Sequence, residues 1–140
     1  MPTNEESVHV LSPEESWGLL SSSQFGRLAV SVANNPDIFP LNFLAHNGLI
    51  LIRTNPGTKL AELAVNGTVA FEADGVSAND AWSVVVKGTA RILESQTEID
   101  AANELPLQHW IRSRMWTYVE ITPTSISGRR FAFGPESDQY

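Results

Sequence analysis

The stretch that decides the fold is residues 38–60, which read IFPLNFLAHNGLILIRTNPGTKL. Asn47 and Gly48 lie between two apolar runs, and an Asn-Gly pair in that setting is the strongest short-range signal of a β-hairpin. We therefore expect residues 49–54 to return antiparallel to the strand that precedes them, at residues 38–46.

The remaining sequence predicts a mainly β protein with short helices. Ser12 and Glu15 form a capping box at the start of one helix, and two further helices are expected at residues 57–66 and 96–104. Period-two alternation predicts other strands at residues 25–32, 68–73, 82–93, 115–121 and 125–133. Residues 74–80 are expected to form a polar loop. About seven antiparallel strands fit a small barrel with helices over its openings better than a parallel sheet.

The composition is that of an acidic globular protein. Its 140 residues include 9 Lys plus Arg, 16 Asp plus Glu and 3 His, for a net charge of −7. A nucleic-acid partner is not expected, since neutralising phosphates takes a basic surface. The absence of cysteine excludes disulfides, thiolate nucleophiles and cysteine-ligated metals.

A chain of this length can bury one core, so one domain is expected at residues 12–134, between tails at 1–11 and 135–140. The first residues lack the basic and apolar segments of a secretion signal, and no stretch approaches the roughly 18 apolar residues of a membrane span. We therefore expect a cytoplasmic protein with no membrane partner.

Residues 52–60 are the strongest candidate for a binding site. A strand is expected to end at Arg53 and Thr54, and a Pro-Gly turn places Thr58 and Lys59 in the first turn of the next helix. Free N–H groups and the positive end of the helix dipole favour an anion there, and these side chains add charge and hydroxyl donors. From spacing alone, a phosphate contact for Lys59 and its extension into solvent are equally supported.

Five segments in order resemble the pyridoxamine 5′-phosphate oxidase-like superfamily, the FMN-binding split barrels. They are PLNF at 40–43, RTNPGTKL at 53–60, AFE at 70–72, WSVVVKG at 82–88, and a closing stretch at 121–131 that contains ITP and ISGRRF. The resemblance covers roughly residues 12–133. It implies a homodimer of six- to seven-stranded antiparallel split β-barrels, with two flavin sites at the subunit interface.

The same resemblance assigns residues to the cofactor. Those for the phosphate are Arg53, Thr54, Thr58 and Lys59, and Gly57 of the same turn is also assigned to the cofactor. The backbone of Leu41, Asn42 and Phe43 is assigned to the isoalloxazine edge. Trp82, Ser83 and Val84 come from the partner subunit, and Arg129 or Arg130 lies beside the cofactor. No catalytic side chain is singled out, because a flavin itself carries the hydride or electrons.

The resemblance implies an FMN-binding oxidoreductase that passes electrons to a small planar acceptor, with FAD or a deazaflavin as alternative cofactors. The C-terminal residues lack the substrate-phosphate motif of the vitamin B6 oxidases, so the chain is more similar to the short branch that includes nitroimidazole-reductase-like proteins. A non-catalytic module that binds or senses a flavin, a deazaflavin or haem is the alternative. His9, His46 and His109 are too far apart in sequence to indicate a metal site.

Overall fold

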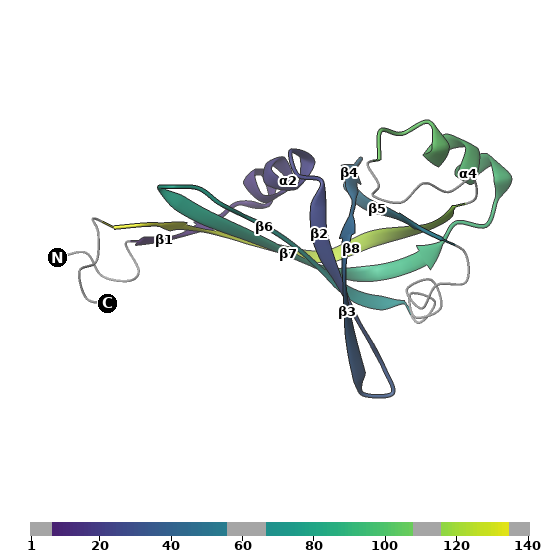
Figure 1. Cartoon of the computed structure of the whole chain (residues 1–140), viewed down its shortest axis with the longest axis horizontal. Coiled ribbons are helices and arrows are strands. Elements are labelled where there is room, and N and C mark those ends of the chain that lie inside the picture. Colours follow the sequence, from purple (N-terminus) through teal and green to yellow (C-terminus); the bar gives the residue numbers. More distant parts are fainter. Residues whose placement is uncertain (1–6, 56–66, 108–115, 135–140) are drawn as a thin grey trace.

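The computed structural model describes residues 7–55, 67–107 and 116–134. Its elements are β1 (Val8–Leu11), α2 (Pro13–Ser21), β2 (Phe25–Val32), β3 (Asn35–Asn42), β4 (Leu44–His46), β5 (Leu49–Thr54), β6 (Thr68–Val76), β7 (Asp80–Ile92), α4 (Gln96–Asn103) and β8 (Thr117–Ala132). The strands pair in the order β3-β2-β6-β7-β8-β5-β4, with β1 added on β8. Figure 1 shows the sheet curling on itself, which makes the chain an antiparallel split barrel.

The two longest strands, β7 and β8, join the parts of the sheet. β8 pairs with β5 at its start, with β7 along most of its length and with β1 at its end. The β7–β8 register shifts at Lys87 and Gly88, which face Ser125 and Pro123. In Figure 1 the β6–β7 hairpin and the ends of β8 and β1 project to the left, away from the barrel.

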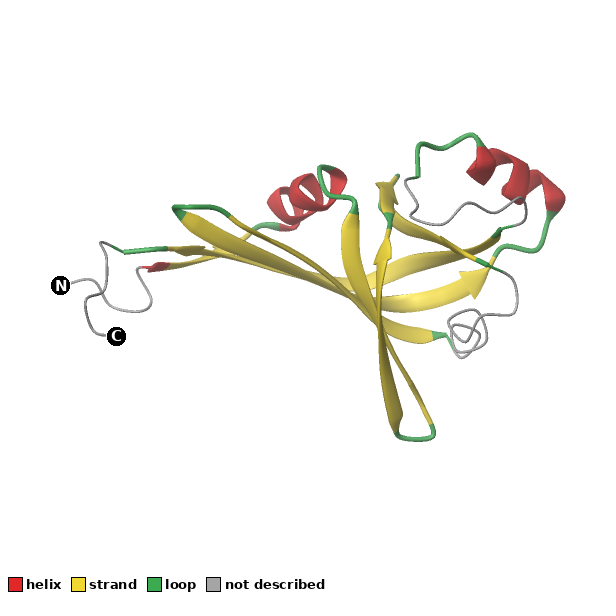
Figure 2. Ribbon diagram, in the orientation of Figure 1, coloured by secondary structure: helices red, strands yellow, loops and turns green. Residues whose placement is uncertain are grey.

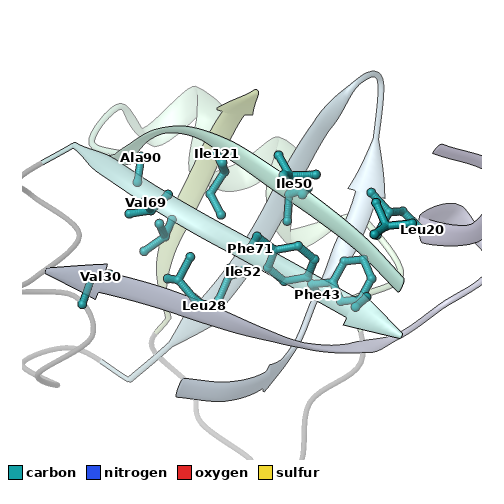
Figure 3. Close-up of a cluster of buried hydrophobic side chains, with 14 residues drawn as sticks. Leu20, Leu28, Val30, Phe43, Ile50, Ile52, Val69, Phe71, Ala90 and Ile121 are labelled. Atoms are coloured by element: carbon teal, nitrogen blue, oxygen red, sulfur yellow. The ribbon is translucent and has the colours of Figure 1, made fainter. Parts of the chain in front are cut away.

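The main core fills the inside of the curled sheet. Phe43 and Phe71 meet edge to face at its centre, with ring centroids 4.7 Å apart, and Figure 3 shows aliphatic side chains from several strands around them. Helix α2 covers one opening by burying Leu20 completely. The capping box predicted for this helix is present, with Ser12 and Glu15 bonded reciprocally at 2.9 and 3.0 Å.

A second, smaller core lies between α4 and the opposite side of β5 and β8. Leu51 and Tyr118 are buried there, against Ala102 of α4 and Leu107. The Tyr118 hydroxyl donates to the side-chain oxygen of Asn103. β5 and the start of β8 are therefore covered on both faces. Figure 2 shows α4 beside this end of the sheet and α2 next to its middle.

The outer face of β1, β2, β6, β7 and the second half of β8 carries the side chains that alternate with the main-core residues. Every exposed large hydrophobic side chain of the described residues falls on this outer face, on the same side of the neighbouring strand β3, or past the end of β8. They are Val10, Phe25, Ile38, Val76 and Phe133. Val76 and Val10 are 79% and 73% exposed. Both residues lie at the projecting end of the sheet, so that end of the outer face is suited to being covered.

Most predicted elements are confirmed, including the hairpin turn, in which Asn47 and Gly48 have φ of 52° and 74°. Three predictions are wrong at their bounds. The loop expected at 74–80 shrinks to three residues because β6 and β7 continue pairing to Val76 and Ala81. The strands expected at 115–121 and 125–133 are one strand, because the bulge near Pro123 lets β8 continue. The strand expected at 38–46 is two strands, β3 and β4, and begins earlier.

Two further differences concern the expected N-terminal tail and a helix. Residues 8–11 form β1, which pairs with the end of β8, so the expected tail contains a strand. The helix expected at residues 57–66 lies outside the described residues.

Candidate functional site

Two segments that the sequence assigns to the cofactor lie side by side at one end of the barrel. The β4–β5 hairpin pairs Leu44 with Leu51, and continuing that register places Asn42 level with Arg53. β3 and β5 contact each other, in agreement with this placement. The segment 41–43 and the end of β5 therefore form one group, which we call the β3–β5 half-site.

The segment 41–43 is fixed by the protein itself. The Phe43 N–H and the Asn42 side-chain amide both donate to the Gln24 carbonyl, at 3.0 and 3.1 Å. The Phe43 ring is only 1% exposed, and Leu41 is half-buried against the main core. The Phe43 side chain and N–H are thus committed to the fold. Leu41 and Asn42 also pair with β2, so only the backbone groups on the side of this segment away from β2 are left for a bound molecule.

Arg53 is the most informative residue of the β3–β5 half-site. Its guanidinium lies over the Trp116 ring, 4.7 Å from the centroid, and one terminal nitrogen donates to the Leu107 carbonyl. Its Nε is buried and has no hydrogen-bond partner among the described residues. A buried donor without a partner costs about 1–3 kcal/mol. An anion placed against this N–H would satisfy it, so the chemistry of the donor fits a phosphate oxygen.

The other residues assigned to the phosphate are only partly visible. Thr54 is half-buried at the end of β5, next to Arg53. Gly57, Thr58 and Lys59 lie outside the described residues.

A second group of assigned residues meets on the projecting part of the sheet. Ser83 of β7 pairs directly with Arg129 of β8, which in turn pairs with Val10 of β1. Ser83 and Arg129 share the outer face, and we call them the β7–β8 half-site. The next residue, Arg130, instead points to the other face and binds Asp80 at 2.7 Å. The Arg130 hydrogen bond lowers the pKa of Asp80. No carboxylate of the described residues pairs with Arg129, which makes it the available arginine of the two.

Trp82 and Val84 have their side chains on the opposite face from Ser83. Val84 is completely buried. The Trp82 indole packs against the main core and lies over Gly75, where a Cβ would be 2.5 Å from the indole Nε1. Both side chains therefore belong to the packing of the sheet, and only their backbone could reach a molecule on the outer face.

The two half-sites are far apart within one chain. Within β8, Tyr118 pairs with Arg53 of β5, and Arg129 pairs with Ser83 of β7. These positions are separated by 11 residues of one strand, or roughly 35 Å of extended chain. That distance exceeds the length of a flavin mononucleotide. Residues from both half-sites can therefore contact one such molecule only if they come from two copies of the chain.

Two other arginines of the described residues are paired with carboxylates. Arg27 binds Glu72 and Asp74 at 2.8 and 2.9 Å, and burial raises the pKa of Glu72 despite this pairing. Arg91 contacts Glu98 and Glu120, and the hydrogen bond from Arg91 lowers the pKa of Glu98.

Lys87 differs from these arginines, because its ammonium is exposed on the outer face and no carboxylate of the described residues pairs with it. Sequence reasoning did not single it out, although it is one of only two lysines in the chain.

The described residues hold no group of three or more His, Asp and Glu side chains that could bind a metal ion. His9 and His46 are both exposed, on β1 and β4, and His109 lies outside the described residues. None of the helices in the described ranges has the length and apolar character needed to cross a membrane.

Comparison with known families and proteins gives consistent matches. Residues 12–130 match the family described as Pyridoxamine 5′-phosphate oxidase. A protein of Mycobacterium tuberculosis without a characterised function is 31% identical over 137 residues, which cover 92% of this chain and 89% of that protein.

Two solved structures share both sequence and fold with the chain. One, from Corynebacterium glutamicum, is provisionally named a pyridoxamine 5′-phosphate oxidase; it is 41% identical, with a TM-score of 0.82 over 96% of this chain and 98% of that one. The other is an FAD binding protein from Mycobacterium smegmatis, 40% identical, with a TM-score of 0.81 over 90% of this chain and all of that one.

Proposed function

Because the chain belongs to the pyridoxamine 5′-phosphate oxidase family, we propose that it is a flavin-binding oxidoreductase that works as a homodimer. The cofactor is FMN or FAD, which share the flavin, the ribityl chain and the first phosphate. The similarity to the FAD binding protein of Mycobacterium smegmatis supports a flavin. The proposed reaction passes electrons from a reductant to a small planar acceptor.

The observation that carries this proposal is the buried Nε of Arg53, which has no hydrogen-bond partner in the part of the chain that the structure describes. The cofactor phosphate would accept a hydrogen bond from it, while the stacking on Trp116 and the bond to Leu107 hold the guanidinium in place. Such preorganisation lowers the cost of binding, because the side chain loses little freedom when the anion arrives. Thr54 continues the same edge, and Lys59 is proposed as a second phosphate contact.

A second copy of the chain completes the site. Its β7–β8 half-site, with Ser83 and Arg129, would lie against the cofactor held by the β3–β5 half-site of the first copy. The exposed apolar side chains at the projecting end of the outer face, such as Val10 and Val76, support burial of that end by the partner. A two-fold axis would then generate two equal sites for each dimer.

When bound, a flavin accepts and donates hydride or single electrons. The protein's own residues have positioning roles. Arg53 holds the phosphate, the backbone of the segment 41–43 holds the ring edge, and the partner's sheet excludes water from one side of the site.

The visible spectrum of the purified protein tests this function directly. We expect a bound or readily added flavin with absorbance near that of free FMN, reduction by a nicotinamide or deazaflavin donor, and reoxidation by a nitroaromatic or quinone acceptor over many turnovers. A protein that binds neither FMN nor FAD contradicts the proposal. Binding without repeated turnover would support the non-catalytic alternative.

A further inference from the structure

A groove of about 310 Å³ opens on the outer face, over β2 and β6. Its floor is flat because small side chains oppose each other there: Ala29 pairs with Ala70 across the two strands, and Ser31 and Thr68 lie one position further along. Pro36 of β3 closes one side. We call this the β2–β6 groove. None of these residues belongs to either half-site.

Lys87 provides the positive charge of the groove. It is directly opposite Ala70 on β7 and lines the groove. Its ammonium is exposed, and no carboxylate of the described residues neutralises it, in a chain with a net charge of −7. Arg27 and Arg91, on the same face, are both held by acidic partners. Lys87 is thus available to an anion from outside the chain.

We propose that the β2–β6 groove binds an adenosine monophosphate group. The methyl groups of Ala29 and Ala70 offer a flat apolar surface to the adenine ring, and the hydroxyls of Ser31 and Thr68 offer hydrogen bonds to its edge. Lys87 binds the phosphate through a charge-assisted hydrogen bond. A mostly apolar cavity of a few hundred Å³ with a small number of polar groups is typical of small-molecule sites.

Two dinucleotides that suit a flavin enzyme carry this group. One is FAD, and the other is a nicotinamide dinucleotide that serves as the electron donor. Lys87 and Ser83 lie on the same face of β7, four residues apart, which is roughly 13 Å along the strand. A dinucleotide can span that distance. This relation to the cofactor rests on the proposed function, whereas binding of free AMP to the groove does not.

The first experiment titrates the full chain with AMP alone and follows binding by calorimetry. We expect Lys87→Ala to weaken AMP binding by about tenfold or more, the scale of a lost charge-assisted hydrogen bond. Ala70→Leu should weaken it by filling the floor, while Lys87→Arg should retain most of it. Ser125→Ala is the matched control, because Ser125 is exposed opposite Lys87 on β8 and does not line the groove.

The second experiment distinguishes the two molecules that could supply the adenosine monophosphate group, FAD and a nicotinamide dinucleotide. If FAD binds more tightly than FMN and Lys87→Ala removes the difference, the group is part of the cofactor. If FAD and FMN bind equally and Lys87→Ala weakens the binding of a nicotinamide dinucleotide to the FMN-loaded protein, the group belongs to the electron donor. Absence of AMP binding at millimolar concentration, or equal affinity in Lys87→Ala, overturns the inference. FMN binding measured in the same Lys87→Ala protein reports separately on the proposed function.

Discussion

Replacing Arg53 by methionine separates its role in the fold from its proposed role at the phosphate. Methionine keeps an unbranched stem against Trp116 but loses every donor. The free protein loses a charge-assisted bond to Leu107, worth about 1.5–3 kcal/mol, and a cation–π contact worth about 0.5–2 kcal/mol. The variant also no longer buries the unsatisfied Nε donor, and this change stabilises the folded protein by about 1–3 kcal/mol. We expect a net destabilisation of about 1–2 kcal/mol.

The effect on the flavin should be larger than the effect on the fold. Loss of the phosphate contact should raise the Kd of FMN by about 10- to 100-fold. At an FMN concentration 100 times the wild-type Kd, binding stabilises the wild-type protein by about 2.7 kcal/mol. The same concentration should stabilise Arg53→Met by only about 0.4–1.4 kcal/mol.

Denaturant unfolding with and without FMN, together with a flavin-fluorescence titration, measures both quantities. Arg53→Lys is the second variant to measure. Lysine keeps the charge but has neither the Nε donor nor the planar group that stacks on Trp116, so it separates the effect of charge from that of geometry. If FMN stabilises Arg53→Met as much as the wild-type protein, Arg53 only anchors Leu107 and Trp116, and the reasoning from its free Nε is refuted.

Three further predictions concern the stability of the sheet. Ala33 has φ of 50° in the β2–β3 turn, so Ala33→Gly should raise the free energy of unfolding by about 0.5–1 kcal/mol in urea unfolding; a loss of stability would show that this conformation is unstrained. Gly75→Ala should lower stability by about 1–3 kcal/mol and shift the Trp82 fluorescence, because the new methyl group would overlap the indole; unchanged fluorescence would count against this packing. The hydrogen bond from Arg130 lowers the pKa of Asp80 below its ordinary 3.8. Its stabilising contribution is therefore present above that value and is lost as the pH falls through the folded-state pKa. The Tm advantage of the wild-type protein over Asp80→Asn should shrink on acidification, and an advantage that grows instead would contradict the sign.

The sequence predicts those parts of the fold that depend on local chemistry. Asn47 and Gly48 specify their turn because both residues tolerate positive φ. The turn at Ala33 and Asn34 has the same backbone signs, but alanine carries no such signal, so β3 could not be given its correct start. The continuity of β8 was missed for a similar reason, since Pro123 reads as a break unless the bulge opposite Gly88 is known.

The candidate site was predictable only as a set of segments. Alternation along β7 does indicate that Ser83 faces away from Trp82, but not which face a partner covers. The surroundings of Arg53 depend on Leu107 and Trp116, which are more than 50 residues away in the chain, and no local pattern encodes that contact. The distance between the two half-sites likewise follows from the pairing of β8 with both β5 and β7.

The central claim is that each flavin site takes residues from two copies of the chain, and complementation between two defective variants tests it most directly. Arg53→Met damages one half-site and Ser83→Trp blocks the other, so neither variant alone should bind FMN tightly. Refolding equal amounts together should give half heterodimers, each with one undamaged site, and so restore tight FMN binding to about a quarter of the wild-type sites. If the mixture binds no more FMN than the separate variants, the two half-sites do not belong to one shared site and the account is wrong.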